Sequence, residues 1–72
     1  MWEVSRLEVV LNGNTEKLAK EMNLSEFLLS KGLNPDTIIV EYNENIVKKQ
    51  EWTKIILQNK DGIEVLKFVG GG

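Results

Sequence analysis

Cysteine and histidine are both absent from this chain of 72 residues. Their absence removes the thiol nucleophile, any disulfide, the usual general base near neutral pH and the commonest metal ligands. A domain of this length buries only about 60% of the surface that its unfolded chain exposes. A buried catalytic cavity of ordinary size would therefore consume the core. We expect no catalytic residues, no metal site and no bound cofactor, and we do not expect an enzyme.

Strongly basic segments and long apolar runs are also missing. The chain has 9 Lys and Arg against 11 Asp and Glu, and its basic residues are scattered apart from Lys48 and Lys49. This pattern favours neither nucleic acid nor an anionic membrane as a partner. No apolar run approaches the length of a membrane span, and the first residues lack the order of a signal peptide. We expect a soluble cytoplasmic protein.

Alternating apolar residues and a two-residue turn predict a hairpin near the start of the chain. Large apolar residues recur at every second position over residues 7–11, the period of a strand with one buried face. Asn12-Gly13 follows, which is the strongest short-range signal for a type I′ turn. A weaker return strand is predicted over residues 15–20. Trp2 and Val4 extend the first strand only if no bulge intervenes, so its start stays open.

A capping box predicts where the one main helix begins. Asn23 is a favourable N-cap residue, and Glu26 follows three positions later. Gly32 is placed to end the helix, and Leu33 to fold back on its last turn. The predicted helix covers about Leu24–Lys31, and it is short enough that it must lie on a sheet.

Three further segments complete the predicted sheet. Ile38–Tyr42 is almost continuously apolar, which is typical of a central strand covered on much of both faces. A brief strand at residues 46–47 follows, and then a short helical turn that places Trp52 over an edge of the core. The final strand is predicted at Ile63–Val69. A right-handed crossover through the helix places a later strand parallel to the first. The fold class is therefore α+β, with a mixed four- to five-stranded sheet and one main helix packed on one face.

The final strand has two sets of alternating residues. We expect Ile63 and Val65 to face the helix, which leaves Glu64, Leu66 and Phe68 on the other face. A sheet covered by one helix has no second layer for these residues, so they predict a docking surface for a partner protein. A register shift of one residue would exchange the two faces.

The sequence ends in Gly70-Gly71-Gly72 after the final strand. Glycine has no Cβ, so this segment has no fold of its own and a narrow channel in a partner can close around it. We expect a domain over residues 1–69 and a thin tail over residues 70–72 that presents the Gly72 carboxylate to an enzyme. The alternative is a frayed end or an engineered linker.

These patterns resemble the ubiquitin-like β-grasp sulfur carriers, and most of all the ThiS family of thiamine biosynthesis. The resemblance covers roughly residues 7–72, and the glycine tail is its most specific part. Four pieces carry it: the first strand with Asn12-Gly13, the helix entry Asn23-Leu24-Ser25-Glu26-Phe27-Leu28, the strand Ile39–Asn43 with Ile46-Val47 and Glu51-Trp52, and the ending from Ile63 to Gly72.

The resemblance implies that this protein is a co-substrate of other enzymes. A ThiF-type adenylyltransferase would use ATP to adenylate Gly72, and sulfur from a cysteine desulfurase or a sulfur-relay protein would then form a thiocarboxylate. Thiazole synthase would receive that sulfur to build the thiazole ring of thiamine. The chain itself would bind no cofactor.

Two alternatives stay open at this point. The small subunit of molybdopterin synthase shares the fold and a terminal Gly-Gly, so molybdopterin or another pathway is a possible destination of the sulfur. A ubiquitin-like modifier or a passive binding module is the other alternative. The Phe-Val-Gly-Gly-Gly ending and the short chain favour the thiamine carrier.

Overall fold

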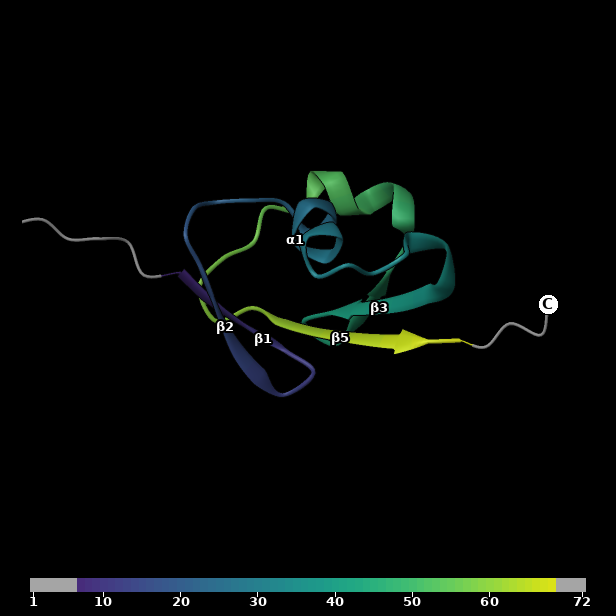
Figure 1. Ribbon diagram of the computed structural model, residues 1–72, viewed down its shortest axis with the longest axis horizontal. Coiled ribbons are helices and arrows are strands. Elements are labelled where there is room, and N and C mark those ends of the chain that lie inside the picture. Colours follow the sequence, from purple (N-terminus) through teal and green to yellow (C-terminus); the bar gives the residue numbers. More distant parts are fainter. Residues whose placement is uncertain (1–6, 69–72) are drawn as a thin grey trace, which may run out of the picture.

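The computed structural model describes residues 7–68, and within them a mixed five-stranded sheet curves around one α-helix (Figure 1). Trp2, Val4 and residues 69–72 lie outside the described part. The sheet has the order β2-β1-β5-β3-β4. Its elements are β1 (Leu7–Leu11), β2 (Asn14–Leu18), α1 (Leu24–Ser30), η1 (Pro35–Thr37), β3 (Ile38–Tyr42), β4 (Asn45–Val47), η2 (Lys49–Lys54) and β5 (Gly62–Lys67).

The β1–β2 hairpin turns at the predicted dipeptide. Asn12 and Gly13 have φ angles of 49° and 85°, as a type I′ turn requires. β2 begins one residue before the predicted start, and its described pairing with β1 ends at Leu7 and Leu18. Among residues 7–68, no strand pairs with residues 19–20, where the chain bends toward the helix.

Helix α1 begins and ends through the two local motifs that the sequence contains. The Asn23 side chain accepts a hydrogen bond from Glu26 N (2.8 Å), and the Glu26 carboxylate accepts one from Asn23 N (3.1 Å). At the other end, Gly32 N donates to Leu29 O and Leu33 N donates to Leu28 O, which is a Schellman motif. The helix ends one residue before the predicted boundary, because Lys31 is its C-cap.

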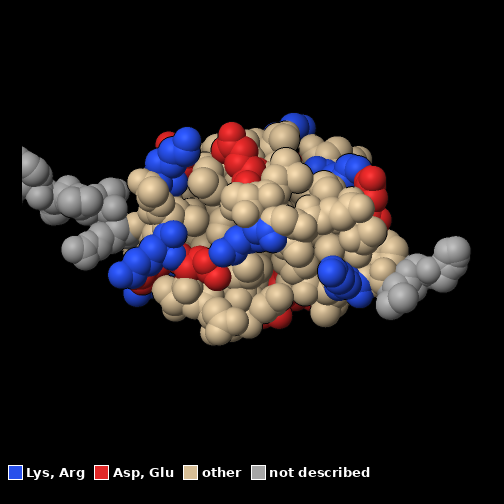
Figure 2. All heavy atoms as spheres, viewed as in Figure 1, with Lys and Arg blue, Asp and Glu red and all other residues tan. Residues whose placement is uncertain are grey.

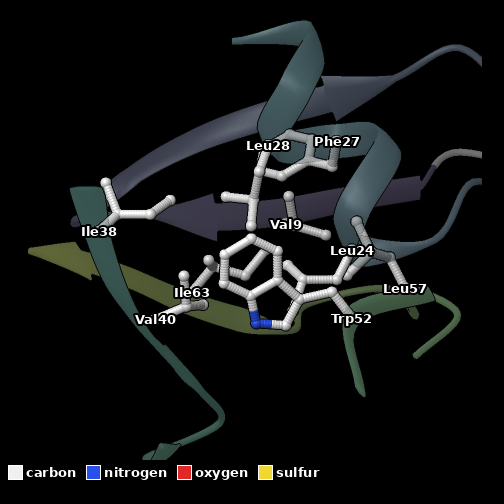
Figure 3. Close-up of a cluster of buried hydrophobic side chains, with 9 residues drawn as sticks. All are labelled: Val9, Leu24, Phe27, Leu28, Ile38, Val40, Trp52, Leu57 and Ile63. Atoms are coloured by element: carbon white, nitrogen blue, oxygen red, sulfur yellow. The ribbon is translucent and has the colours of Figure 1, made fainter. Parts of the chain in front are cut away.

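The core lies between α1, η2 and one face of the sheet (Figure 3). Trp52 on η2 packs into this cluster, as predicted, and its indole N–H donates to Val47 O (3.3 Å). Full burial of each large apolar side chain contributes about 1.5–3 kcal/mol. The buried residues are Val9, Leu24, Phe27, Leu28, Ile38, Val40, Trp52, Leu57 and Ile63.

β5 lies in the middle of the sheet and gives it its mixed character. It runs parallel to β1 and antiparallel to β3. The parallel neighbour confirms the crossover that was expected from the order of the elements.

A buried carboxylate ties the start of β5 to the end of β3. Asp61 is 7% exposed and accepts hydrogen bonds from the Tyr42 hydroxyl, the Asn43 side-chain amide (3.1 Å) and Gln58 N (2.8 Å). The Asn43 side-chain oxygen in turn accepts from Gly62 N (2.7 Å). These bonds fix the point at which the last strand enters the sheet.

We predict that Asp61→Ala destabilises the protein by about 2–3 kcal/mol, because three donors lose a charged acceptor. Urea unfolding measures the change. Glu21→Ala is the matched control, since Glu21 is an exposed carboxylate. Equal unfolding free energies for the two variants would contradict the assigned role of Asp61.

Burial, followed by the Asp61 hydrogen bond and charge, raises the pKa of Tyr42 to about 12. An unfolded tyrosine ionises near pH 10. The contribution of Tyr42 to stability is therefore fully present below about pH 10 and is lost as the pH rises through about 12. Tyr42 is the chain's single tyrosine, so tyrosinate absorbance reports it alone. We predict a midpoint near 12 that moves toward 10 in Asp61→Asn, and an unchanged midpoint would contradict the contact.

Candidate docking face and C-terminal site

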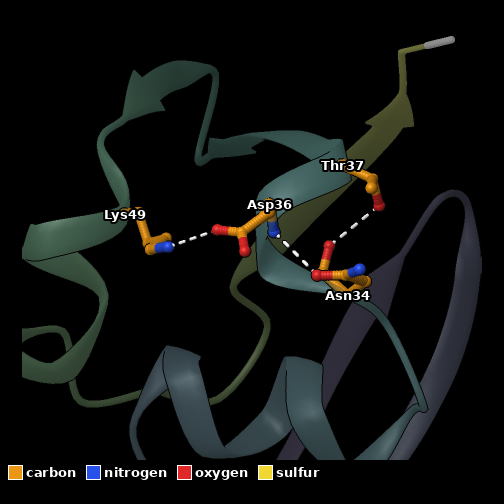
Figure 4. A network of polar contacts seen from close by, with 4 residues as sticks. All are labelled: Asn34, Asp36, Thr37 and Lys49. Carbon is orange, nitrogen blue, oxygen red and sulfur yellow. Dashed lines mark hydrogen bonds and ion pairs between the residues drawn. The ribbon is translucent and has the colours of Figure 1, made fainter. Parts of the chain in front are cut away.

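The end of β5 is held to the sheet up to the last described residue. Phe68 N donates to Thr37 O (3.0 Å). The turn that supplies this carbonyl is braced by its own polar contacts (Figure 4): the Asn34 side chain accepts from Asp36 N, and the Thr37 hydroxyl donates to Asn34 O. An exposed ion pair joins Asp36 to Lys49. The predicted reactive segment, Gly70 to Gly72, follows in sequence and lies outside the described residues.

The predicted faces of β5 are confirmed. Ile63 is 1% exposed and Val65 is half-buried against the core, whereas Leu66 is 58% and Phe68 46% exposed. Glu64 is exposed on the same side as Leu66 and Phe68. The three side chains predicted to bind a partner therefore share the face of the sheet that the helix does not cover.

Neighbouring strands add apolar residues that the sequence did not assign to this face. Ile39 on β3 lies directly opposite Leu66, and Ile46 on β4 is exposed on the same side. We call Ile39, Ile46, Leu66 and Phe68 the outer apolar patch. The prediction that β3 is covered on much of both faces is wrong, because α1 and η2 both lie on the inner face. The sequence could not predict that Ile39 lies beside Leu66, because this depends on the register of the β3–β5 pairing.

Carboxylates occupy the same face next to the patch. Glu64 lies directly opposite Glu41 in the β3–β5 pairing, and like charges in this position destabilise a sheet. Neither ion pair within residues 7–68 involves them. An open hollow of about 360 Å³ beside them is also lined by Glu44, Val10 and one basic residue, Lys60. Three carboxylates and one lysine line this hollow, so the apolar patch lies beside a mainly acidic region, which suits a partner surface that carries apolar and basic side chains.

Charges of both signs are interspersed over the view in Figure 2, without a large field of one sign. Within residues 7–68, no helix is long and apolar enough to cross a bilayer. The same residues contain no cluster of three side chains of the kinds that bind metals.

The curved mixed sheet that holds a single helix on one face is the ubiquitin-like β-grasp fold. A thiamine biosynthesis protein (ThiS) from Geobacter metallireducens has the same fold, with a TM-score of 0.79 over 92% of this chain and 100% of that one at 23% identity. The family model of the ThiS family matches residues 9–72. The chain belongs to the ThiS family.

Two relatives in sequence differ in length. The sulfur carrier protein ThiS of Bacillus subtilis is 36% identical over 63 residues, which are 86% of this chain and 96% of the relative. A thiazole synthase of Magnetococcus marinus is 32% identical over 66 residues, which are 92% of this chain. The chain spans only about a fifth of that synthase, 20% of its length.

We predict that Phe68→Asp lowers the unfolding free energy by less than about 1 kcal/mol, because Phe68 lies on an exposed surface. Ile63→Asp, on the inner side of the same strand, should unfold the protein because it would bury a charge without a partner. Urea unfolding of both variants checks the assignment of the faces. If Phe68→Asp lowered the unfolding free energy more than Ile63→Asp does, the two faces of β5 would have to be exchanged.

Proposed function

We propose that this protein is a sulfur carrier of thiamine biosynthesis and that the carboxyl group of Gly72 is its reactive group. The observation that supports this most strongly is the family match, which runs through the last glycine. The protein is then a co-substrate of other enzymes, and it binds no cofactor of its own. We place the reaction in the cytoplasm, where ATP is supplied.

A carboxylate must be activated before sulfur can replace one of its oxygens, because oxide is a poor leaving group. In the proposed cycle, a Gly72 oxygen attacks the α-phosphorus of ATP on a ThiF-type adenylyltransferase, and pyrophosphate leaves. The terminal sulfur of a persulfide on a cysteine desulfurase or a sulfur-relay protein then attacks the acyl carbon, and AMP leaves with the bonding electrons. A second thiol attacks the inner sulfur of the resulting acyl disulfide, so that this thiol and the donor cysteine leave together as a disulfide. The product is a thiocarboxylate, without net oxidation of the protein. The chain has no Cys or His that could intercept the acyl adenylate.

Thiazole synthase is the proposed recipient of the sulfur. In the Magnetococcus marinus relative, a segment similar to nearly all of this chain is part of a polypeptide named thiazole synthase. Joining two proteins in one chain raises their effective concentration for each other. This arrangement supports a partnership between the carrier and the synthase.

The folded part of the protein would serve recognition. Leu66 and Phe68 of the outer apolar patch lie at the end of β5, from which the tail continues in sequence, and Glu64 lies earlier on the same strand. An enzyme that covers this face would bury Leu66 and Phe68 and would hold Gly72 at a fixed distance from them. Gly70 and Gly71 would be the thin segment that enters its active site.

We predict that intact-protein mass spectrometry, after incubation with the adenylyltransferase, ATP and a sulfide source, shows a gain equal to one sulfur minus one oxygen. A chain that carries a C-terminal amide at Gly72 is the matched control, because it lacks only the carboxylate. Deletion of Gly71 and Gly72 should also abolish the gain and leave urea unfolding unchanged.

Three results would contradict this function. The first is a mass of the untreated natural protein that differs from the mass of a chain ending at Gly72. The amidated control could gain sulfur like the wild type. Conjugates with lysines of other proteins, in place of the thiocarboxylate, would indicate a protein modifier.

A further inference from the structure

β5 extends beyond the end of its parallel neighbour. β1 pairs with β5 only at Val10–Gly62 and Leu11–Ile63, and the chain then turns away into the hairpin. Figure 1 shows β5 continuing past this turn, with β3 along its other side. The backbone ladder on the β1 side ends with Asn12 N, which donates to Ile63 O (2.8 Å).

A side chain replaces the next backbone bond. Val65 N donates to the Asn12 side-chain oxygen at 2.7 Å, where a longer β1 would have supplied a carbonyl. Asn12 is held with a φ of 49° in the turn, so its side chain caps the ladder at this point. Beyond Val65, no described strand lies on this side of β5.

The alternation of hydrogen bonds in the β3–β5 pairing shows which backbone groups of β5 face the side without a described partner strand. Phe68 N bonds to Thr37 O and Asn43 N to Gly62 O, so the even-numbered residues of β5 bond to β3. Val65 O and the N–H and C=O of Lys67 therefore point to the open side. None of the residues in the described part supplies a partner strand for them. A row of such groups is a template for pairing with another chain.

An apolar groove lies beside this open edge. It has a volume of about 540 Å³ and is lined by Leu11, Asn12, Lys31, Leu33, Val65 and Lys67. Its apolar lining can receive a side chain from a strand placed next to β5. Lys67 is exposed at its rim, and a lysine at an edge hinders pairing with a second, identical copy. The groove therefore favours a different protein, with an apolar residue for the groove and an acidic one near Lys67.

We propose that the adenylyltransferase adds an extended segment to the sheet at Val65–Lys67, in the place that β1 leaves empty. This inference rests on the proposed function. Main-chain bonds to this edge would hold β5 straight immediately before the tail, and pairing of this kind binds extended peptides in many complexes. The edge and the outer apolar patch then form one continuous contact surface around the last strand.

Lys67→Pro tests the pairing, because it removes the Lys67 N–H and leaves the Leu66 N–H that faces β3 and the Phe68 N–H that bonds to Thr37 O. Proline is tolerated where a strand's N–H faces away from its partner. Lys67→Gln is the matched control, since it removes the charge and keeps the N–H. We expect the KM for the carrier in thiocarboxylate formation to rise about tenfold in Lys67→Pro relative to Lys67→Gln.

Equal KM values for the two variants would overturn the pairing, and so would a loss confined to sulfur transfer to thiazole synthase. If Lys67→Pro fails to fold, an amide-to-ester replacement between Leu66 and Lys67 removes the same N–H without a proline ring, and the same comparison applies. Failure of the proposed function gives a different result, because the wild type itself would then gain no sulfur.

Discussion

The mixed pairing of β5 determines where the functional parts of the molecule lie. This strand bonds to β1 and β3 at its start and to β3 at its end. Its inward residue Ile63 is buried in the core, and its outward residues Leu66 and Phe68 are exposed. Because the tail follows β5 in sequence, the sheet, the outer apolar patch and the glycines are joined through one strand. The Asp61 network and the Thr37 carbonyl hold the two ends of that strand.

A core with one helical layer explains why the other face of the sheet remains exposed. α1 and η2 cover the inner face, and nine apolar residues of the described part of the chain are buried there. Within residues 7–68 no further element covers the outer face, and Ile39, Ile46, Leu66 and Phe68 are exposed there. Exposed apolar side chains that lie together in this way are typical of protein interfaces. The small size of the domain and its role as a carrier are thus related: the partner would supply the missing layer.

Local motifs were predictable from the sequence because each involves residues close together in the chain. The Asn12-Gly13 turn, the Asn23–Glu26 capping box and the stop at Gly32 were all predicted, and the alternation in β5 placed Ile63 on the inner and Phe68 on the outer face. The helix boundary at Lys31 and the end of β2 differed by one or two residues, where fraying competes with pairing.

Features that depend on register were not predictable. Ile39 and Ile46 became part of the outer apolar patch only once their strand neighbours were known. The sequence indicated only a turn at Asp61, because its hydrogen-bond partner Tyr42 is 19 positions away in sequence. The point at which β1 stops pairing with β5 depends on how far the hairpin reaches, which no local pattern encodes. Tertiary pairing, and not propensity, determines each of these features.

Residue-by-residue amide exchange along β5, in the free protein and in its complex with the adenylyltransferase, tests the account most directly. Slow exchange is expected at Leu66 and Phe68 in both states, because the Leu66 amide faces β3 and the Phe68 amide bonds to Thr37 O just before it. The account predicts fast exchange at Lys67 in the free protein and slow exchange in the complex. A Lys67 amide that exchanges slowly in the free protein, or that stays fast in the complex, would contradict it.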